Sequence, residues 1–220
     1  MANAEGSRLV TVLLAAAIVV AAGIAVTSAY EWSSGRIAAN ERARVVARLN
    51  SVLDSSLRGR DLTTTRLDIT DAELLGSDDP VDVFVVSEAG EPVAVLFASV
   101  APHGYNAAIN LLIGVSPAGV VTGVRAVRHR ETSGLGDAIE SAKSAWIEQF
   151  SGKTLASPDA ILWAVQQDDG AFDAITGATV TSRAVVAAVK NTLLYFDRHR
   201  SELYAAAAAA AAADDDGRPE

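Results

Sequence analysis

The sequence predicts an α+β protein in which a single N-terminal transmembrane helix precedes one domain with an antiparallel sheet and flanking helices. Three patterns predict this class: an uncharged apolar run at 9–30, β-rich runs with short turns within 81–127, and a helix with one apolar face after residue 181. Half of the 220 residues are hydrophobic and the mean hydropathy is +0.24, which is high for a purely soluble protein. We expect the soluble part to be one domain spanning about 38–204.

Charge and residue usage exclude several functions. The net charge is −9, from 18 basic and 27 acidic residues, which argues against nucleic-acid binding because that needs a basic surface. The absence of cysteine excludes disulfides, thiolate catalysis and cysteine-bound zinc or iron–sulfur clusters. His103, His129 and His199 are far apart and form no metal-binding pair, so surface or hydrogen-bonded histidines are the favoured interpretation.

The run at 9–30 is long enough to cross a membrane. Its uncharged residues span about 33 Å as an α-helix, against about 30 Å for the hydrocarbon core of a bilayer. A cleaved signal peptide with a small-residue site at 27–29 is the alternative, but the apolar core of a signal peptide usually has only about 7–15 residues. We therefore expect a retained anchor, preceded by a short tail at 1–8.

The arginines around this run do not settle its orientation. Arg8 stands alone before the span, whereas four arginines follow it between residues 36 and 48. The positive-inside rule would place the domain in the cytoplasm, but the rule is weaker when a long domain must cross. Charge alone leaves the topology open.

Four runs of β-forming residues are expected to be strands. They span 81–86, 92–100, 107–115 and 120–127. Short turn-prone segments separate the first pair at 87–91 and the second pair at 116–119. Runs joined by such short turns pair antiparallel, because a parallel pair needs a long crossover.

Helices are expected on either side of these strands. An amphipathic helix at 41–57 leads into the domain, another is predicted at 138–150, and 162–165 is a shorter apolar run. The segment at 62–79 is mixed and acidic and runs into a turn-prone stretch at 76–80.

The C-terminal tail at 205–220 has low complexity. Nine alanines are followed by three aspartates and a short polar end. Alanine favours helix, but nine alanines are too few to span a membrane and carry no side chains for a core. We expect the tail to be a dispensable extension.

The stretch 173–181, with the sequence DAITGATVT, is the first candidate site. Small residues, Gly177 and Ala178, stand among the hydroxyls of Thr176, Thr179 and Thr181. The following helix is indicated by apolar positions spaced by three and four residues, with Thr181 or Ser182 as its expected N-cap: Val185, Ala188, Val189, Thr192, Leu193 and Phe196. A helix start of this kind favours an anion. On spacing alone, an ordinary polar turn before a capped helix is the favoured interpretation, because such turns are common.

The second candidate site, HRETSGLGDAIE at 129–140, follows the last expected strand directly. Gly134 and Gly136 flank Leu135, so the backbone can turn sharply and present its amides. Glu131 and Thr132 stand at the strand end, where side chains can reach a cleft. The alternative is an ordinary glycine loop leading to a helix capped by Asp137.

Together the two stretches resemble the G subunit of the Rnf ion-translocating electron-transport complex. The resemblance is carried by HRETSGLGDAIE, by GYNAAINLLIGVSPAGVVTGVRAVRH at 104–129, and by LWAVQQDDGAFDAITGATVTSRAVVAAVK at 162–190. The single N-terminal span and the chain length agree, so the resemblance covers about 9–199. It implies that the domain at 38–204 is an FMN-binding domain.

The resemblance implies FMN bound covalently, through its phosphate, to a threonine. The family pattern falls on Thr176-Gly177-Ala178-Thr179, with an acidic residue, Asp173, three positions before it. Thr179 is the expected acceptor, with Thr181 as the second choice. A separate flavin transferase makes the bond from FAD in this family.

The resemblance also implies a role for the glycine loop in holding the flavin. Backbone around Gly134, Leu135 and Gly136 is expected close to the ring or the ribityl chain, with Glu131 and Thr132 as polar contacts. Ser133 stands where the family usually has proline, which removes a rigid φ but keeps both glycines. Trp146 is expected either beside the flavin or in the core.

The implied function is electron relay within a complex that couples electron transfer between ferredoxin and NAD to ion movement. The implied partners are the other membrane, iron–sulfur and flavin subunits, a flavin transferase and the lipid bilayer, and nucleic acid is not expected. The flavin domain is expected outside the cytoplasm, on the bacterial inner membrane.

Two alternatives stand beside this assignment. The C subunit of the sodium-translocating NADH:quinone reductase shares the attachment pattern, although the short chain and the LGDAIE continuation favour the Rnf family. A flavin-free assembly or scaffold protein of such a complex is the other, although Thr179 and Asp173 are both present.

Overall fold

A computed structural model describes residues 51–53, 55–57, 60 and 62–216 of the chain. All of them lie in the compact unit Leu49–Glu220. The expected tail at 1–8, the expected span at 9–30 and most of the expected helix at 41–57 lie outside the described residues. Within the described ranges, none of the helices combines the length and the apolar character that a membrane span requires.

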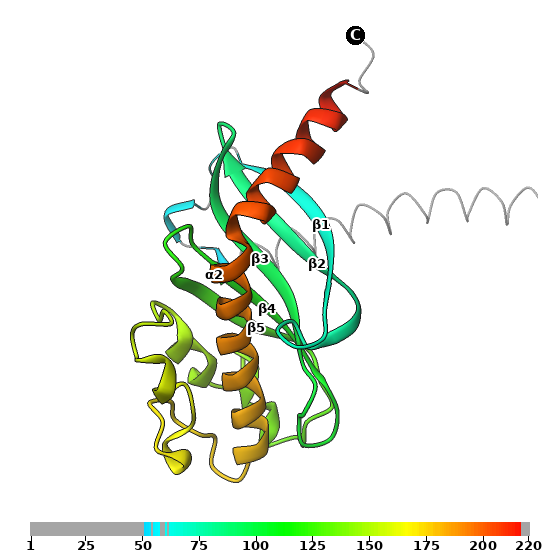
Figure 1. Cartoon of the computed structure of the whole chain (residues 1–220). Helices are drawn as coiled ribbons and strands as arrows, with labels where there is room; N and C mark the ends of the chain where they lie inside the picture. Colours follow the sequence, from blue (N-terminus) through cyan, green and yellow to red (C-terminus); the bar gives the residue numbers. More distant parts are fainter. Residues whose placement is uncertain (1–50, 54, 58–59, 61, 217–220) are drawn as a thin grey trace, which may run out of the picture. The chain divides into compact units, whose positions relative to one another are not determined.

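A five-stranded antiparallel meander forms the body of the domain (Figure 1). Its strands, each hydrogen-bonded to the next, are β1 (Thr63–Asp71), β2 (Ser77–Glu88), β3 (Glu91–Ala101), β4 (Ile109–Val115) and β5 (Val121–Arg128). The four predicted strands are confirmed as β2 to β5, and so is the antiparallel pairing.

The sequence does not predict strand β1, and β2 begins inside the stretch expected to be a turn. Residues 63–71 alternate between exposed and half-buried positions and carry threonines, arginine and aspartates, because β1 is an edge strand with only one neighbour. A polar edge strand lacks the strong hydrophobic alternation that identifies a half-buried strand. Its pairing with β2, from Thr63↔Ser87 to Asp71↔Ser77, is what defines it.

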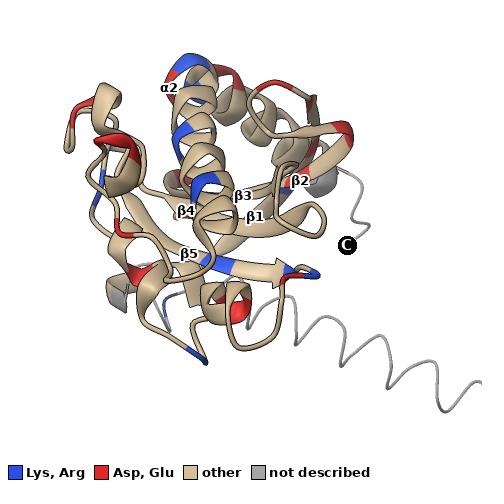
Figure 2. Cartoon of the chain, turned by 90° about the horizontal axis from the view of Figure 1, so that it is seen from below, with Lys and Arg blue, Asp and Glu red and all other residues tan. Residues whose placement is uncertain are grey.

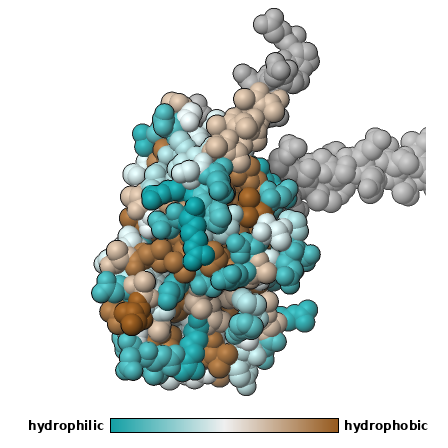
Figure 3. All heavy atoms as spheres, in the orientation of Figure 1, coloured by the Kyte–Doolittle hydropathy of each residue, from teal (hydrophilic) through white to brown (hydrophobic). Residues whose placement is uncertain are grey.

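One long helix, α2 (Thr179–Asp216), packs on one face of the sheet (Figure 1). Phe97 of β3 meets the rings of Tyr195 and Phe196 edge-on, with centroids 6.0 and 6.3 Å apart. The predicted apolar face of the helix is confirmed, since Val185, Val189 and Leu193 are buried. Figure 3 shows hydrophilic residues along the exposed side of the first part of α2, bordered by hydrophobic patches, whereas the protruding alanine run is coloured as mildly hydrophobic.

The predicted N-cap of this helix is wrong. α2 begins at Thr179, so Thr181 and Ser182 lie in its first turn. The Ser182 amide donates to the Ala178 carbonyl at 3.0 Å, which adds a turn before the expected start. The Ser182 hydroxyl instead accepts the Ile175 amide at 2.9 Å and so holds the preceding loop.

The helix continues through the alanine run to Asp216, and its last turns extend past the strands (Figure 1). Leu203 and Ala207 are buried in the core, so the start of the tail packs on the domain. That the tail is dispensable stays a prediction.

A second apolar cluster lies on the opposite face of the sheet. Val52, Leu53 and Leu57 pack against alternate positions of the strands, including Leu96 and Leu112. Side chains alternate between the two faces of a sheet, which is why Leu96 joins this cluster while Phe97 joins the other. Residues 51 and 52 are helical and Ser55–Leu57 forms the 3₁₀ turn η1, so the described end of the 41–57 segment places apolar side chains as expected.

The helix predicted at 138–150 is wrong. Two 3₁₀ turns, η2 (Gly136–Ile139) and η3 (Trp146–Phe150), flank a non-helical segment. Side chains there bond to nearby backbone, as when Ser144 Oγ accepts the Trp146 amide at 2.9 Å, and such bonds compete with helix. The apolar run at 162–165 lies at the end of η4 (Ala160–Leu162), with Trp163 and Val165 buried, and η5 (Gln166–Asp168) follows.

Candidate cofactor-binding site

A pocket of about 250 Å³ lies where three chain segments meet. It is lined by Tyr105, Glu131, Thr132, Leu135, Gly136, Gly177, Ala178 and Thr181. The first comes from the connection between β3 and β4, the next four follow β5, and the last three surround the start of α2. The structure therefore brings together the two stretches that the sequence singled out.

The Glu131 carboxylate lies at the centre of this junction. Glu131 is only 8% exposed, and its oxygens accept the amides of Tyr105 at 3.3 Å and Asn106 at 3.1 Å. One oxygen also accepts a hydrogen bond from the Thr181 hydroxyl. Buried carboxylates need such donors, because an unsatisfied buried charge is costly. Glu131 thus binds protein groups from two other segments.

Thr132 is held by the same connection. The Asn106 amide side chain donates to Thr132 Oγ1 at 3.3 Å and to the Arg130 carbonyl at 2.9 Å. Asn106 therefore links the β3–β4 connection to the residues after β5 through three hydrogen bonds, two from its side-chain amide and one from its backbone amide to Glu131.

The two glycines of the loop serve different needs. Gly134 has a φ of +80°, which favours glycine, and an added Cβ would meet no atom within 4 Å. At Gly136 a Cβ would lie 2.9 Å from Glu131 Cβ and 3.1 Å from Thr181 Oγ1, so this position needs space. Leu135 between them is 45% exposed at the pocket. The other loop approaches it, since a Cβ on Gly177 would lie 3.1 Å from Leu135 Cδ2.

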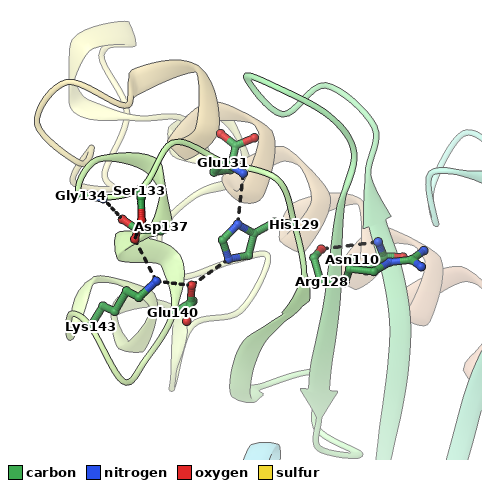
Figure 4. Close-up of polar contacts among 9 residues, drawn as sticks. All are labelled: Asn110, Arg128, His129, Glu131, Ser133, Gly134, Asp137, Glu140 and Lys143. Atoms are coloured by element: carbon green, nitrogen blue, oxygen red, sulfur yellow. Dashed lines mark hydrogen bonds and ion pairs between the residues drawn. The ribbon is translucent and has the colours of Figure 1, made fainter.

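A network of polar side chains next to the pocket holds the glycine loop (Figure 4). Asp137 accepts the Gly134 amide at 2.8 Å and the Lys143 ammonium at 2.8 Å. Lys143 also donates to Glu140 at 2.7 Å, and Glu140 lies 3.1 Å from His129 Nε2. His129 Nδ1 accepts the Glu131 amide at 3.2 Å, which joins the network to the pocket.

This network shifts the titration of its members. The hydrogen bond from Lys143 is the main cause that lowers the pKa of Asp137 below its usual range, and it lowers the pKa of Glu140 in the same way. The two carboxylates in turn raise the pKa of Lys143. The charged state of all three groups is therefore favoured.

The turn before α2 is anchored away from the pocket. The Asp173 carboxylate accepts the Gln166 side chain at 2.6 Å, and its backbone carbonyl accepts the Trp146 indole at 2.8 Å. Trp146 also meets Phe150 edge-on at 5.6 Å, so it supports this turn from the core side. Asp173 and Thr176 are exposed, and neither lines the pocket.

The candidate hydroxyls differ in environment. Thr181 is 1% exposed and is engaged with Glu131, whereas Thr179 is half-buried at the first position of α2. Residues two positions apart in an α-helix project in directions that differ by about 200°. Because Thr181 points toward Glu131, Thr179 is turned away from it. The first amides of a helix lack a helical acceptor, and within the described chain the Ser182 amide is the first to bond back along α2.

Sequence reasoning missed Tyr105 and Asn106. Tyr105 is 66% exposed and lines the pocket, although no periodic pattern marks it. Its signal in the sequence is its place in GYNAAINLLIG, one of the segments that carry the family resemblance. Of the predicted contacts, Gly134 and Thr179 are sequence neighbours of residues that line the pocket, but they do not line it themselves.

A larger groove of about 530 Å³ runs along another side of the first turns of α2. Val180, Arg183 and Ala187 line it, facing His103 and Glu73. It contains none of the predicted site residues, and Arg183 within it is paired with Asp168 through contacts of 2.5 and 2.6 Å. We therefore place the candidate site at the smaller pocket.

Comparison with known proteins identifies the class of this domain. The family model of the FMN-binding domain matches residues 104–194, a range that includes both loops of the pocket. The protein class is thus that of FMN-binding domains.

Whole-chain relatives narrow this to one family, the G subunits of ion-translocating oxidoreductase complexes. The chain is 37% identical over 193 residues to the G subunit from Shewanella baltica, covering 88% of this chain and 91% of the relative. It is 39% identical over 170 residues to that from Shewanella oneidensis, covering 77% and 80%. Over 133 residues, 60% of this chain and 62% of the relative, it is 50% identical to that from Pseudomonas aeruginosa. The chain belongs to this G-subunit family, as predicted.

The groups that line the pocket are compatible with part of a flavin mononucleotide. Tyr105 and Leu135 offer exposed apolar surface on which a ring can pack, and the start of α2 offers amides and a positive dipole end for a phosphate. Its volume is below the roughly 300–1,000 Å³ common for enclosed ligand sites. A flavin held here therefore keeps part of its surface exposed.

Proposed function

We propose that the protein is a membrane-anchored flavoprotein that carries FMN as a phosphoester on Thr179 and relays electrons within an ion-translocating oxidoreductase complex. The observation that carries the proposal is the convergence of the glycine loop and the Thr179 turn on one pocket within an FMN-binding domain. FMN supplies the redox chemistry by accepting and donating electrons, and the protein supplies binding and electrostatics.

Accessibility supports Thr179 over Thr181 as the attachment site. The Thr181 hydroxyl is buried and already donates to Glu131, so a phosphate there would displace an internal bond. Thr179 stands beside the amides of the first turn, where the helix dipole favours negative charge. In the transferase reaction the Thr179 hydroxyl loses its proton and its Oγ1 forms a P–O bond to the FMN phosphorus, while the pyrophosphate bond of FAD breaks and AMP leaves, with the proton released to solvent.

The exposed flavin suits electron relay. Electrons must enter from one partner protein and leave to another, and a ring that keeps an open side lets both approach. The proposed partners are the other membrane, iron–sulfur and flavin subunits of the complex, with a flavin transferase for maturation. We place the domain on the extracytoplasmic side of the bacterial inner membrane, held by a span at 9–30.

The test of attachment is in-gel flavin fluorescence after denaturing electrophoresis of the full chain co-expressed with a flavin transferase. The wild-type band should fluoresce and Thr179→Ala should not, whereas Thr179→Ser, which keeps a hydroxyl, should retain signal. Thr64→Ala on the exposed side of β1 is the control for threonine removal. A dark wild-type band, with an unmodified intact mass, would contradict covalent FMN, and a bright Thr179→Ala band would move the attachment site.

Protease treatment of sealed inside-out and right-side-out vesicles tests the orientation. We expect the domain to be cleaved only where the extracytoplasmic face is outside. Cleavage in the opposite vesicles would place it in the cytoplasm.

A further inference from the structure

Hydrogen bonds to one side chain join the three segments that meet at the pocket. The Glu131 carboxylate binds the Thr181 hydroxyl from α2 and the amides of Tyr105 and Asn106 from the β3–β4 connection. We call these groups the Glu131 clasp. Glu131 and Thr181 are 50 residues apart in sequence, so the clasp joins segments that no local turn holds together.

The clasp is built tightly. Gly136 leaves no room for a Cβ beside Glu131 and Thr181, and the Glu131 amide is itself held by His129. A hydroxyl–carboxylate bond is charge-assisted and gains strength where water is excluded. Thr181 therefore has one strongly preferred position.

The consequence concerns Thr179, two residues earlier in the same turn of α2. Because the backbone of one helical turn is rigid, holding Thr181 against Glu131 also sets the direction in which Thr179 projects. The amide of Tyr105, which also lines the pocket, is held by the same carboxylate. The Glu131 carboxylate thus sets the position of both the turn that carries Thr179, the proposed phosphate attachment point, and the pocket wall at Tyr105.

We propose that Glu131 and Thr181 are positioning residues that fix the Thr179 turn and the Tyr105 wall relative to each other for flavin attachment and flavin tuning. This inference rests on the proposed function. It assigns Thr181 a role other than phosphate acceptor, and it assigns Glu131 a role in holding protein groups. It also places a carboxylate charge beside the pocket, which disfavours the added negative charge of a reduced flavin.

The chain offers a matched control on the same helix. Thr192 is 0% exposed, and its hydroxyl shares a 2.7 Å hydrogen bond with Ser99 of β3. Thr192→Val removes a buried hydroxyl bond between α2 and another segment, as Thr181→Val does, but far along the helix from the pocket. A purely structural effect would be similar in both variants.

The experiment follows flavin incorporation over time in the full chain, presented in membranes to a flavin transferase and FAD. We expect Thr181→Val to slow incorporation about tenfold, the loss that one hydrogen bond to a charged group represents. Thr181→Ser should restore the rate, and Thr192→Val should match the wild type. In the loaded protein, Glu131→Gln should shift the flavin reduction potential to more positive values and alter its circular dichroism.

Equal rates in Thr181→Val and Thr192→Val, with an unchanged potential and dichroism in Glu131→Gln, would overturn the clasp while leaving the proposed function intact. A wild-type chain that takes up no flavin would instead refute the proposed function. If Thr181→Val does not accumulate, Glu131→Gln, which keeps the volume of the side chain, decides the question through the same rate comparison.

Discussion

The Lys143 ammonium lies 2.8 Å from an Asp137 carboxylate whose other oxygen accepts the Gly134 amide. This charge pair therefore holds the backbone of the glycine loop (Figure 4). Figure 2 shows acidic residues distributed over the loops, with basic residues along α2 and at the end of β5. The loop is stabilised from its own C-terminal side, whatever occupies the pocket.

Lys143→Met should raise the pKa of both Asp137 and Glu140 toward the usual range, because the hydrogen bond from Lys143 is the main cause that lowers the pKa of each. Carboxyl-carbon NMR titration of the domain within the full chain measures this directly. Lys190→Met on α2 is the control and should leave both values unchanged. Unchanged titration in Lys143→Met would show that the pairing does not hold in solution.

The same pairing predicts the pH dependence of stability. A carboxyl with a lowered folded-state pKa contributes stability above its unfolded pKa, which is lost as the pH falls through the folded value. The wild type should therefore exceed Lys143→Met in unfolding free energy at neutral pH, and the difference should shrink below about pH 4. Urea unfolding at a series of pH values measures it. A difference that stays constant with pH would contradict the assignment.

Gly136→Ala should harm the site more than Gly134→Ala. The added methyl at Gly136 meets Glu131 at 2.9 Å, an overpacking that typically costs about 1–3 kcal/mol, and it displaces the carboxylate that holds Thr181. At Gly134 the methyl meets open space, and only its φ of +80° adds about 1–2 kcal/mol. Both variants lose stability in urea unfolding, but only Gly136→Ala should reduce flavin incorporation. A larger loss of flavin incorporation in Gly134→Ala than in Gly136→Ala would show that the loop conformation matters more than the space beside Glu131.

Tyr105→Ala should change the bound flavin and leave the fold intact. Tyr105 is 66% exposed, so the loss of its side chain removes little buried surface, but the residue lines the pocket. A tyrosine ring stacked on the flavin quenches its fluorescence by donating an electron to the excited ring, so Tyr105→Ala should raise the fluorescence yield. Tyr105→Phe should raise it as well, because phenylalanine can stack but does not donate an electron in this way. Emission spectra of the loaded protein test this. Identical yields in all three proteins would place the ring elsewhere.

Phe97→Ala should destabilise the domain by about 3–5 kcal/mol. Phe97 is fully buried and joins β3 to Tyr195 and Phe196 of α2, so its removal leaves a cavity between the sheet and the helix that bears Thr179. Phe97→Leu fills part of the cavity and should cost less. Equilibrium denaturation gives both values, and a loss below about 0.5 kcal/mol, the size of a surface change, would mean that the core collapses around the site.

Much of the candidate site can be predicted because its signals are local. The motif around Thr179 and the glycine loop at 134–136 each lie within a few residues, and the family resemblance ties the two together. What no local pattern reveals is the carboxylate between them. The place of Glu131 at a strand end predicts a flavin contact, whereas its bonds go to Thr181, Tyr105 and Asn106.

By itself the sequence determined the four strands of β2 to β5, the apolar face of α2 and the family, because alternation, helical spacing and short motifs are properties of neighbouring residues. Only the tertiary structure decided that the polar segment 63–71 is an edge strand, since its identity comes from pairing with β2. It also decided that 138–150 is not a helix, and that Thr181 is engaged while Thr179 is left half-exposed. The edge strand and the Thr181 contact depend on hydrogen bonds with partners far away in the sequence, and those partners are set by how the chain folds back on itself. Within 138–150 the competing bonds are local, such as the one from the Trp146 amide to Ser144, and no hydrophobic spacing pattern reveals them.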